Sequence, residues 1–276
     1  MEQKQEKFIN QQKKITFGKN TYSHTISLIP VLSEKSKSIS FQHLHDQNEI
    51  IYFISGNCTL VTEDFSYSPT PGDIVFIPAN KYHFLQLTGT DVYERIVLNF
   101  YGSETIDTLL SCAFENRHFI NVSADGKFAG LFERFEEYRD TLQAWQFEVV
   151  ASSLLHEFLC LCCGNSLSQT KNIKSSEKIL KGALNYINKN LTTIEDIQEI
   201  ADAVFVSSSY IYQLFQKKLR ISPKRLLAQK RLLLARSCIL SGEPPYAVYQ
   251  KCGYKDYSTF YRAYKSQFQQ SPAESE

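Results

Sequence analysis

Two segments near the end of the chain repeat one helical pattern, and this repeat strongly constrains the fold. The segment SSSYIYQLFQKKLRISP runs from Ser207 to Pro223, and DYSTFYRAYKSQFQQSP runs from Asp256 to Pro272. Apolar residues recur in both at positions i, i+3 and i+4, so each segment is predicted to contain an amphipathic helix. A constant offset aligns the two helices, which indicates two copies of one supersecondary unit.

The outward faces of the two predicted helices carry hydrogen-bond donors, aromatic rings and cations. They comprise Ser209, Tyr212, Gln213 and Gln216 in the first copy, and Ser258, Tyr261, Arg262 and Lys265 in the second. Such groups can read base edges and bind phosphates in DNA. A shorter helix is predicted ahead of each, over 194–203 and 246–252. Each copy therefore has the order of a helix-turn-helix unit.

Many individual positions in this region follow one known pattern. They are Ile200-Ala201, Ser207, Tyr210-Ile211 and Leu214-Phe215 in the first unit, Arg231 and Ala235 in the linking helix, and Cys252-Gly253-Tyr254, Asp256, Ser258, Phe260, Lys265 and Ser271-Pro272 in the second unit. At these positions, the segment from residue 178 to residue 272 resembles the AraC/XylS family of bacterial transcription regulators. The resemblance implies a regulator, more often an activator, with double-stranded DNA and RNA polymerase as partners.

The departures from the family pattern lie mainly in the second unit and the turns. Arg220 and Gln269 stand where the family usually has glycine after each recognition helix, so both turns must close without a residue that favours positive φ. Pro245 and Tyr249 replace the usual Ile and Ala ahead of the second recognition helix. These departures favour the first unit as the DNA reader, and they leave open a partner-binding adaptor without DNA affinity.

Side-chain chemistry suggests a role for each predicted DNA contact. Tyr212, Gln213 and Arg262 are expected to read bases, because Gln can pair with adenine and Arg with guanine in the major groove. Residues near helix ends are expected to hold phosphates; they include Ser207, Lys217, Lys218 and Lys255. Ser209, Ser258 and Tyr261 complete the predicted set, and a solvated helix face is the alternative for each residue. The helix over 224–240 should place the two units roughly one turn of DNA apart.

The charge of the chain is unevenly distributed. Residues 177 to 276 carry 15 Lys and Arg against 9 Asp and Glu, a net charge of +6, whereas residues 1 to 176 have a net charge of −5. This asymmetry favours nucleic-acid binding by the C-terminal part alone. No apolar run approaches the roughly 20 residues of a membrane span, and the polar N-terminus lacks the apolar core of a signal peptide. We therefore expect a cytoplasmic protein without a membrane partner.

The N-terminal part is rich in predicted strands. After a polar lead-in over 1–23, the segment 24–126 contains runs such as IYFIS, CTLVT, DIVFIP and YERIVLNF between turns, which predict a small antiparallel barrel. The stretches HLHDQNE, from His43, and GDIVFIPANKYH, from Gly72, resemble the two cupin motifs. The segment also resembles AraC-type sensor domains, so we expect a cupin-like domain that senses a small molecule.

Four side chains occupy the positions that bind metal in cupin enzymes, namely His43, His45, Glu49 and His83. Imidazoles and a carboxylate are good ligands for Zn²⁺, Fe²⁺ or Mn²⁺. We nevertheless favour a site without a cofactor, in which these groups and Tyr52 bind a polar effector such as a sugar or small amine or bond to one another. Strand alternation does not decide whether Tyr82 or His83 faces inward. A metal-dependent cupin enzyme with a helical appendage is the competing function, but it leaves the repeated unit unexplained, so we favour a non-enzymatic regulator.

Residues 127 to 163 regain helical periodicity and form the predicted connector. The second connector helix has a broad apolar face, which we expect to pack partly on the barrel and partly on a second subunit in a homodimer. Packing within one chain is the alternative. A polar linker is predicted over 164–176, followed by the DNA-binding domain over 177–276. The expected fold class is α+β multidomain, with a cupin-like barrel, a helical connector and an all-α double helix-turn-helix domain.

Overall fold

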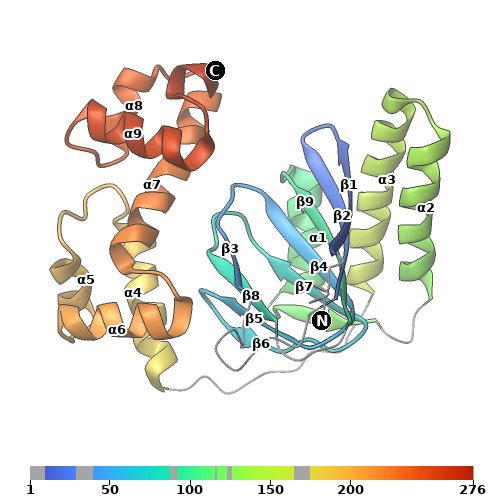
Figure 1. Ribbon diagram of the computed structural model, residues 1–276, viewed down its shortest axis with the longest axis horizontal. Coiled ribbons are helices and arrows are strands. Elements are labelled where there is room, and N and C mark those ends of the chain that lie inside the picture. Colours follow the sequence, from blue (N-terminus) through green and yellow to red (C-terminus); the bar gives the residue numbers. More distant parts are fainter. Residues whose placement is uncertain are drawn as a thin grey trace, which may run out of the picture.

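The computed structural model describes residues 10–28, 40–87, 92–115, 117–122, 126–164 and 175–275. In the described chain, two antiparallel sheets and three helices form the N-terminal part, and the C-terminal part is helical (Figure 1). This arrangement confirms the predicted fold class. The predicted linker over 164–176 lies largely outside the described residues, from 165 to 174.

The N-terminal sheets contain six and four strands. Their orders are β1-β2-β9-β4-β7-β10 and β3-β8-β5-β6, with antiparallel pairing throughout. The strands are β1 (Asn10–Phe17), β2 (Asn20–Leu28), β3 (Ser40–His43), β4 (Asn48–Ser55), β5 (Cys58–Thr62), β6 (Ser66–Tyr67), β7 (Asp73–Ile77), β8 (His83–Leu87), β9 (Val92–Phe100) and β10 (Phe119–Asn121). Phe53 and Val75 of the larger sheet and Leu60 and Leu85 of the smaller one share a buried core, so the sheets face each other.

Three helices cover the outer face of the larger sheet: α1 (Glu104–Phe114), α2 (Lys127–Thr141) and α3 (Ala144–Cys163) (Figure 1). Side chains alternate along a strand, so Ile50 and Leu98 face these helices while Ile51 and Val97 face the barrel interior. Within the described residues, α3 alone is long and apolar enough to cross a membrane. Seven of its 20 residues are buried in the helix and sheet core, so the helix packs against the larger sheet.

Two N-terminal boundaries differ from the sequence prediction. The predicted lead-in over 1–23 extends too far, because β1 and the start of β2, from residue 10 onward, belong to the larger sheet; residues 1–9 lie outside the described residues. The prediction missed β1 because it is an edge strand that buries Ile15 and Phe17 but carries Lys13 and Lys14 directly before them. Helix α1 lies inside the predicted cupin-like segment over 24–126, in a stretch for which no helix was predicted.

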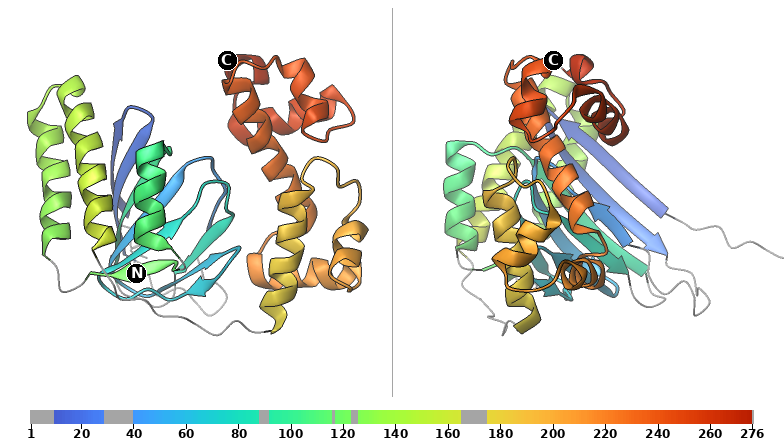
Figure 2. Two further views of the ribbon diagram at one scale, coloured as in Figure 1. Left: turned by 180° about the vertical axis from the view of Figure 1, so that it is seen from behind. Right: turned by 90° about the vertical axis from the view of Figure 1, so that its left-hand side faces the viewer.

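The C-terminal part contains two helix-turn-helix units at the two ends of α7 (Figures 1 and 2). Its helices are α4 (Ser175–Lys189), α5 (Ile197–Ala203), α6 (Ser208–Leu219), α7 (Pro223–Leu240), α8 (Pro245–Lys251), α9 (Tyr257–Phe268) and a 3₁₀ helix (Pro272–Ser275). The side chains of Ser207 and Asp256 accept hydrogen bonds from backbone N–H groups in the first turns of α6 and α9. Equivalent caps therefore start both recognition helices.

The two turns that lack glycine adopt a left-handed backbone conformation. Arg220 ends α6 with φ 58° and ψ 19°, and Gln269 ends α9 with φ 58° and ψ 15°. Glycine reaches this region without steric cost, whereas other L-residues are strained there. The turns therefore close in the usual helix-ending geometry, at a conformational cost that the family's glycine would avoid.

Candidate functional site

The predicted DNA-contacting residues lie on open faces of the two units. Eight of the ten are exposed, and Lys218 and Tyr261 are half-buried. The opposite faces of α6 and α9 are buried, with Phe215 and Phe260 fully enclosed. Both recognition helices therefore present the predicted polar face to solvent, as the repeat pattern requires.

Two of the predicted phosphate contacts also have partners within the chain. Ser207 caps α6 through its hydroxyl, and the Lys255 ammonium lies 3.0 Å from the Glu195 carboxylate in an exposed ion pair. An exposed pair of this kind contributes little stability, so the Lys255 ammonium can exchange Glu195 for another anion.

Arg231 fixes the two units relative to each other. From α7, its guanidinium donates hydrogen bonds to the carbonyls of Leu191 (2.8 Å) and Ile194 (2.6 Å) in the first unit and of Gly253 (3.0 Å) in the second. Arg231 was predicted only as a position of the family pattern, and its role in joining the units had no signal in the sequence. One side chain thus links both recognition units to the helix between them.

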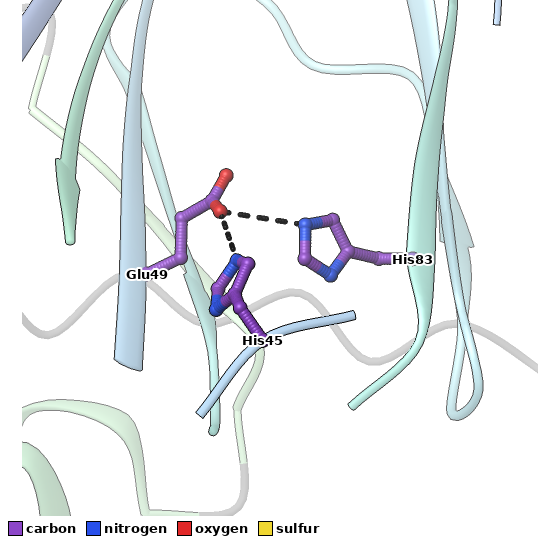
Figure 3. A group of neighbouring side chains, drawn as sticks. All are labelled: His45, Glu49 and His83. Carbon is purple, nitrogen blue, oxygen red and sulfur yellow. Dashed lines mark hydrogen bonds and ion pairs between the residues drawn. The ribbon is translucent and has the colours of Figure 1, made fainter. Parts of the chain in front are cut away.

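A histidine and glutamate cluster lies inside the barrel, where β4 and β8 begin (Figure 3). Glu49 Oε2 is 2.8 Å from His45 Nε2, 3.4 Å from His83 Nε2 and 3.1 Å from the Asn99 amide nitrogen. Glu49 and His83 are buried, and the ligand atoms of the three predicted residues lie within 4.8 Å of one another. Three of the four predicted metal ligands therefore converge on one point.

The hydrogen bonds behind the two imidazoles fix which nitrogen carries a proton. The Nδ1 of His45 is 2.9 Å from the Gln47 carbonyl, and that of His83 is 3.0 Å from the Lys81 carbonyl. A carbonyl only accepts, so each Nδ1 is a donor and each Nε2 of a neutral ring directs a lone pair at Glu49. Three acceptors that face one another need a shared cation, either added protons or a metal ion.

The pKa shifts agree with a cation between these groups. Burial would raise the pKa of Glu49, but hydrogen bonds from His45 and His83 hold it well below its ordinary value. Burial would lower the pKa of His45, but its contact with Glu49 raises the pKa above the ordinary value. The carboxylate therefore stays ionised and favours positive charge at the point where the three groups meet.

Two predicted site residues lie elsewhere. Tyr52 does not line the barrel, because it is three residues from Glu49 on β4 and thus faces the helix layer, where its ring stacks on Phe132 at 5.1 Å. His43 is exposed, and it stacks on His83 at 5.4 Å without joining the converging ligand atoms. Alternation also places Tyr82 outside and His83 inside the barrel.

Comparisons with known proteins cover both parts of the chain. An AraC-like ligand binding domain model matches residues 34–159, and a helix-turn-helix domain model matches residues 200–275. The chain belongs to the AraC family of transcription regulators. This family member binds DNA through its C-terminal part and carries an effector-binding sensor domain at its N-terminus.

Several relatives match this AraC-family chain over most of its length. The probable transcriptional regulator LumQ of Photobacterium leiognathi is 26% identical over 245 residues, which cover 87% of this chain and 92% of LumQ. The Msm operon regulatory protein of Streptococcus mutans is 23% identical over 254 residues, with coverages of 87% and 88%. Among solved structures, the AraC-like transcriptional activator CuxR is 16% identical, with coverages of 84% and 82% and a TM-score of 0.42.

Proposed function

We propose that this regulator reads a bipartite DNA site, with α6 and α9 in adjacent segments of the major groove. The observation that carries this proposal is the pair of exposed, similarly capped recognition helices, which Arg231 ties to one linking helix. Tyr212, Gln213 and Arg262 contact bases, and the residues near helix ends contact phosphates. The protein acts in the cytoplasm as an activator that contacts RNA polymerase.

Capture of genomic fragments on the purified protein tests this function. At physiological salt, the retained fragments should share a site of two conserved blocks roughly one helical turn apart. Binding should weaken as salt rises, because phosphate contacts release counterions. Retention without a shared site, or no retention with and without cell extract as a source of effector, would contradict sequence-specific regulation. A metal-dependent cupin enzyme would then be the function to test.

We further propose that the cluster of His45, Glu49 and His83 binds a divalent transition-metal ion. Two imidazoles and a carboxylate suit Zn²⁺, Fe²⁺ or Mn²⁺, and backbone carbonyls behind ligating imidazoles are typical of metal sites. The ion serves as the effector or anchors a small polar effector, because it supplies positive charge and open coordination positions. The converging acceptor atoms support this proposal over an effector site without metal.

Metal analysis of protein purified without a histidine tag tests this site. We expect close to one equivalent of a transition metal per chain, retained after dialysis. Less than roughly a tenth of an equivalent, together with no uptake when Zn²⁺, Mn²⁺ or anaerobic Fe²⁺ is added, would contradict the proposal. The Glu49 and histidine network would then be closed by protons alone.

A homodimer formed through α3 is the third part of the proposed function. Trp145 and Val149 lie one helical turn apart on α3 and are 70% and 61% exposed, although other residues of the helix are buried in the same chain. Exposed apolar groups at this spacing suit a matching helix of a second copy. A dimer brings together two DNA-binding parts and extends the site that the protein can read.

A further inference from the structure

The sensor domain contacts the DNA-binding part through the outer face of its smaller sheet (Figure 1). Phe84 of β8 is buried in one cluster with Leu180 of α4 and Leu219 of α6. The Tyr82 hydroxyl donates a hydrogen bond of 3.0 Å to the Leu219 carbonyl, at the end of the first recognition helix. The Gln42 amide donates one of 3.3 Å to the Arg220 carbonyl. The sheet thus holds the end of α6.

A buried ion pair joins the sensor domain to α7. Lys230 Nζ lies 2.7 Å from Glu63 Oε1, and the two side chains are 5% and 1% exposed. The same ammonium donates a hydrogen bond of 2.8 Å to the Asn80 carbonyl, and the backbone N–H of Tyr82 donates to Glu63 at 2.9 Å. Removal of one partner from such a pair leaves a buried charge uncompensated. The contact is therefore a strong restraint on α7 as long as both partners are present.

Asn80 connects this ion pair to the histidine and glutamate cluster. Its N–H donates a hydrogen bond of 2.8 Å to the His45 carbonyl, and its own carbonyl accepts the bond from Lys230. Asn80 also has a φ of 62°, a left-handed conformation that costs free energy in a residue with a Cβ. His83, three residues after Asn80, is itself a member of the cluster. A shift of His45 or His83 therefore acts on the backbone that holds Lys230.

On α7, Lys230 is adjacent to Arg231. Lys230 contacts the sensor domain, whereas Arg231 contacts carbonyls of both recognition units. A movement of this turn of α7 changes the position of both side chains together. The sensor domain can therefore influence the relative placement of α6 and α9 without any direct contact with α9.

The charges at the same contact lower DNA binding only a little. A cavity of about 230 Å³ is lined by Glu63 and Asp64 of the sensor domain and by Lys217, Lys218 and Arg220 at the end of α6. Carboxylates beside the basic end of a recognition helix lower its attraction for DNA phosphates. Glu63 and Asp64 are paired with Lys230 and Lys81, so their charge adds little, and the docked sensor domain weakens DNA binding mainly by its hold on α7.

We infer that the Glu63 and Lys230 ion pair is a latch through which the sensor domain restrains DNA binding, and that the segment 80–83 links the latch to the His45, Glu49 and His83 cluster. This inference rests on the proposed function, because it concerns regulation of the same DNA-binding units. Release of the latch raises the fraction of molecules that bind DNA tightly.

The test compares full-length wild type with Glu63→Gln and Lys230→Met on one captured DNA site. Each variant should bind about fivefold more tightly or better, and the double variant should gain no more than either single variant, because all three lose the same contact. Asp64→Asn is the matched control, since it removes the same charge from the adjacent residue, whose partner Lys81 lies within the sensor domain. Its affinity should stay within about twofold of wild type.

Three results would overturn the latch. One is unchanged affinity in folded Glu63→Gln and Lys230→Met, and another is an equal gain in Asp64→Asn, which would indicate charge alone. If both latch variants unfold, the test uses Tyr82→Phe, which removes only the bond to Leu219 and should still tighten DNA binding measurably. Unchanged affinity in Tyr82→Phe would be the third result that overturns the latch. Failure of wild type to bind DNA would instead contradict the proposed function. A gain of affinity in the latch variants, together with DNA binding by wild type, would support both the latch and the proposed function.

Discussion

Arg262 and Lys255 lie in the same unit but are expected to contact different parts of DNA. Arg262→Ala should cost about 1–3 kcal/mol of binding free energy and relax the preference at one base pair, because a guanidinium can bond to both acceptors of guanine. Lys255→Ala should weaken binding to all sequences alike and reduce the salt slope by about 1. Affinities for a library of single base-pair changes measure both effects. A loss that is equal for every sequence would make Arg262 a phosphate contact.

Glu49 provides the residue-scale test of metal binding. With Zn²⁺ at about 100 times its dissociation constant, the wild-type sensor domain should gain about 2.7 kcal/mol of unfolding free energy, because the folded site alone has converging ligands. Glu49→Gln keeps the side-chain shape but removes the ionised ligand, so most of this gain should be lost. Thermal unfolding of the full chain with and without Zn²⁺ measures this gain in both proteins.

Tyr52→Phe is the matched control for this experiment, since Tyr52 lies on the same strand but faces the helix layer. It should respond to Zn²⁺ as wild type does. An equal response from Glu49→Gln would show that the ion binds elsewhere on the chain.

The sequence predicted this cluster in part, for reasons visible in single residues. The spacing of His45 and Glu49 indicated a shared site, and the second motif supplied His83. Strand alternation from Glu49 already places Tyr52 on the opposite face of β4, so the prediction that Tyr52 binds the effector inside the barrel was avoidable. In contrast, the choice between Tyr82 and His83 needed the pairing of His83 with His43, and strand register is set by tertiary packing.

At the scale of elements, the end of α9 offers a test of backbone strain. Gln269→Gly should raise the unfolding free energy by about 0.5–1 kcal/mol, because Gln269 has a φ of 58° and glycine adopts this conformation without a Cβ clash. Gln267→Gly, two residues earlier and inside the helix, should instead lower stability by about 0.5–1 kcal/mol. Denaturant unfolding of both variants measures the difference. Loss of stability in both would indicate that the Gln269 side chain contributes more than its backbone strain costs.

The helices were easier to predict than the edges of the sheets. Recognition helices α6 and α9 show apolar periodicity, side-chain caps and a repeat, and these signals agree with one another. The short helix α5 begins at Ile197 rather than at the predicted 194, because Asp196 forms its capping box with Glu199. Strand β1 gives no comparable signal, since an edge strand with one buried face and several lysines has the composition of a surface segment.

At the scale of the whole molecule, the contact between the two parts had no signature in the sequence. Glu63 and Lys230 are far apart in the chain, and single charged residues are typical of solvent-exposed positions. Only the fold brings the turn after β5 next to α7 and buries both charges. The net charges of the two parts, −5 and +6, were interpreted only as an indication of DNA binding by the C-terminal part.

The oligomeric state is the prediction that belongs to the whole molecule. We expect a dimer of the 31.8 kDa chain at micromolar concentration, with Trp145 and Val149 of two α3 helices buried against each other. Trp145→Ser combined with Val149→Ser should give monomers, because burial of these side chains supplies about 25 cal/mol per Å² of apolar surface. Light scattering after size exclusion measures the mass.

Tyr246→Ser is the control for this experiment. Tyr246 is 74% exposed on α8, far from α3 in the fold, so its loss should leave the dimer intact (Figure 1). The α3 variant should also bind a bipartite site more weakly than wild type, because a dimer engages two DNA-binding parts at high effective concentration. A wild-type monomer at tens of micromolar would leave one chain to read its site alone. A dimer that survives both α3 substitutions would place the interface on another part of the chain.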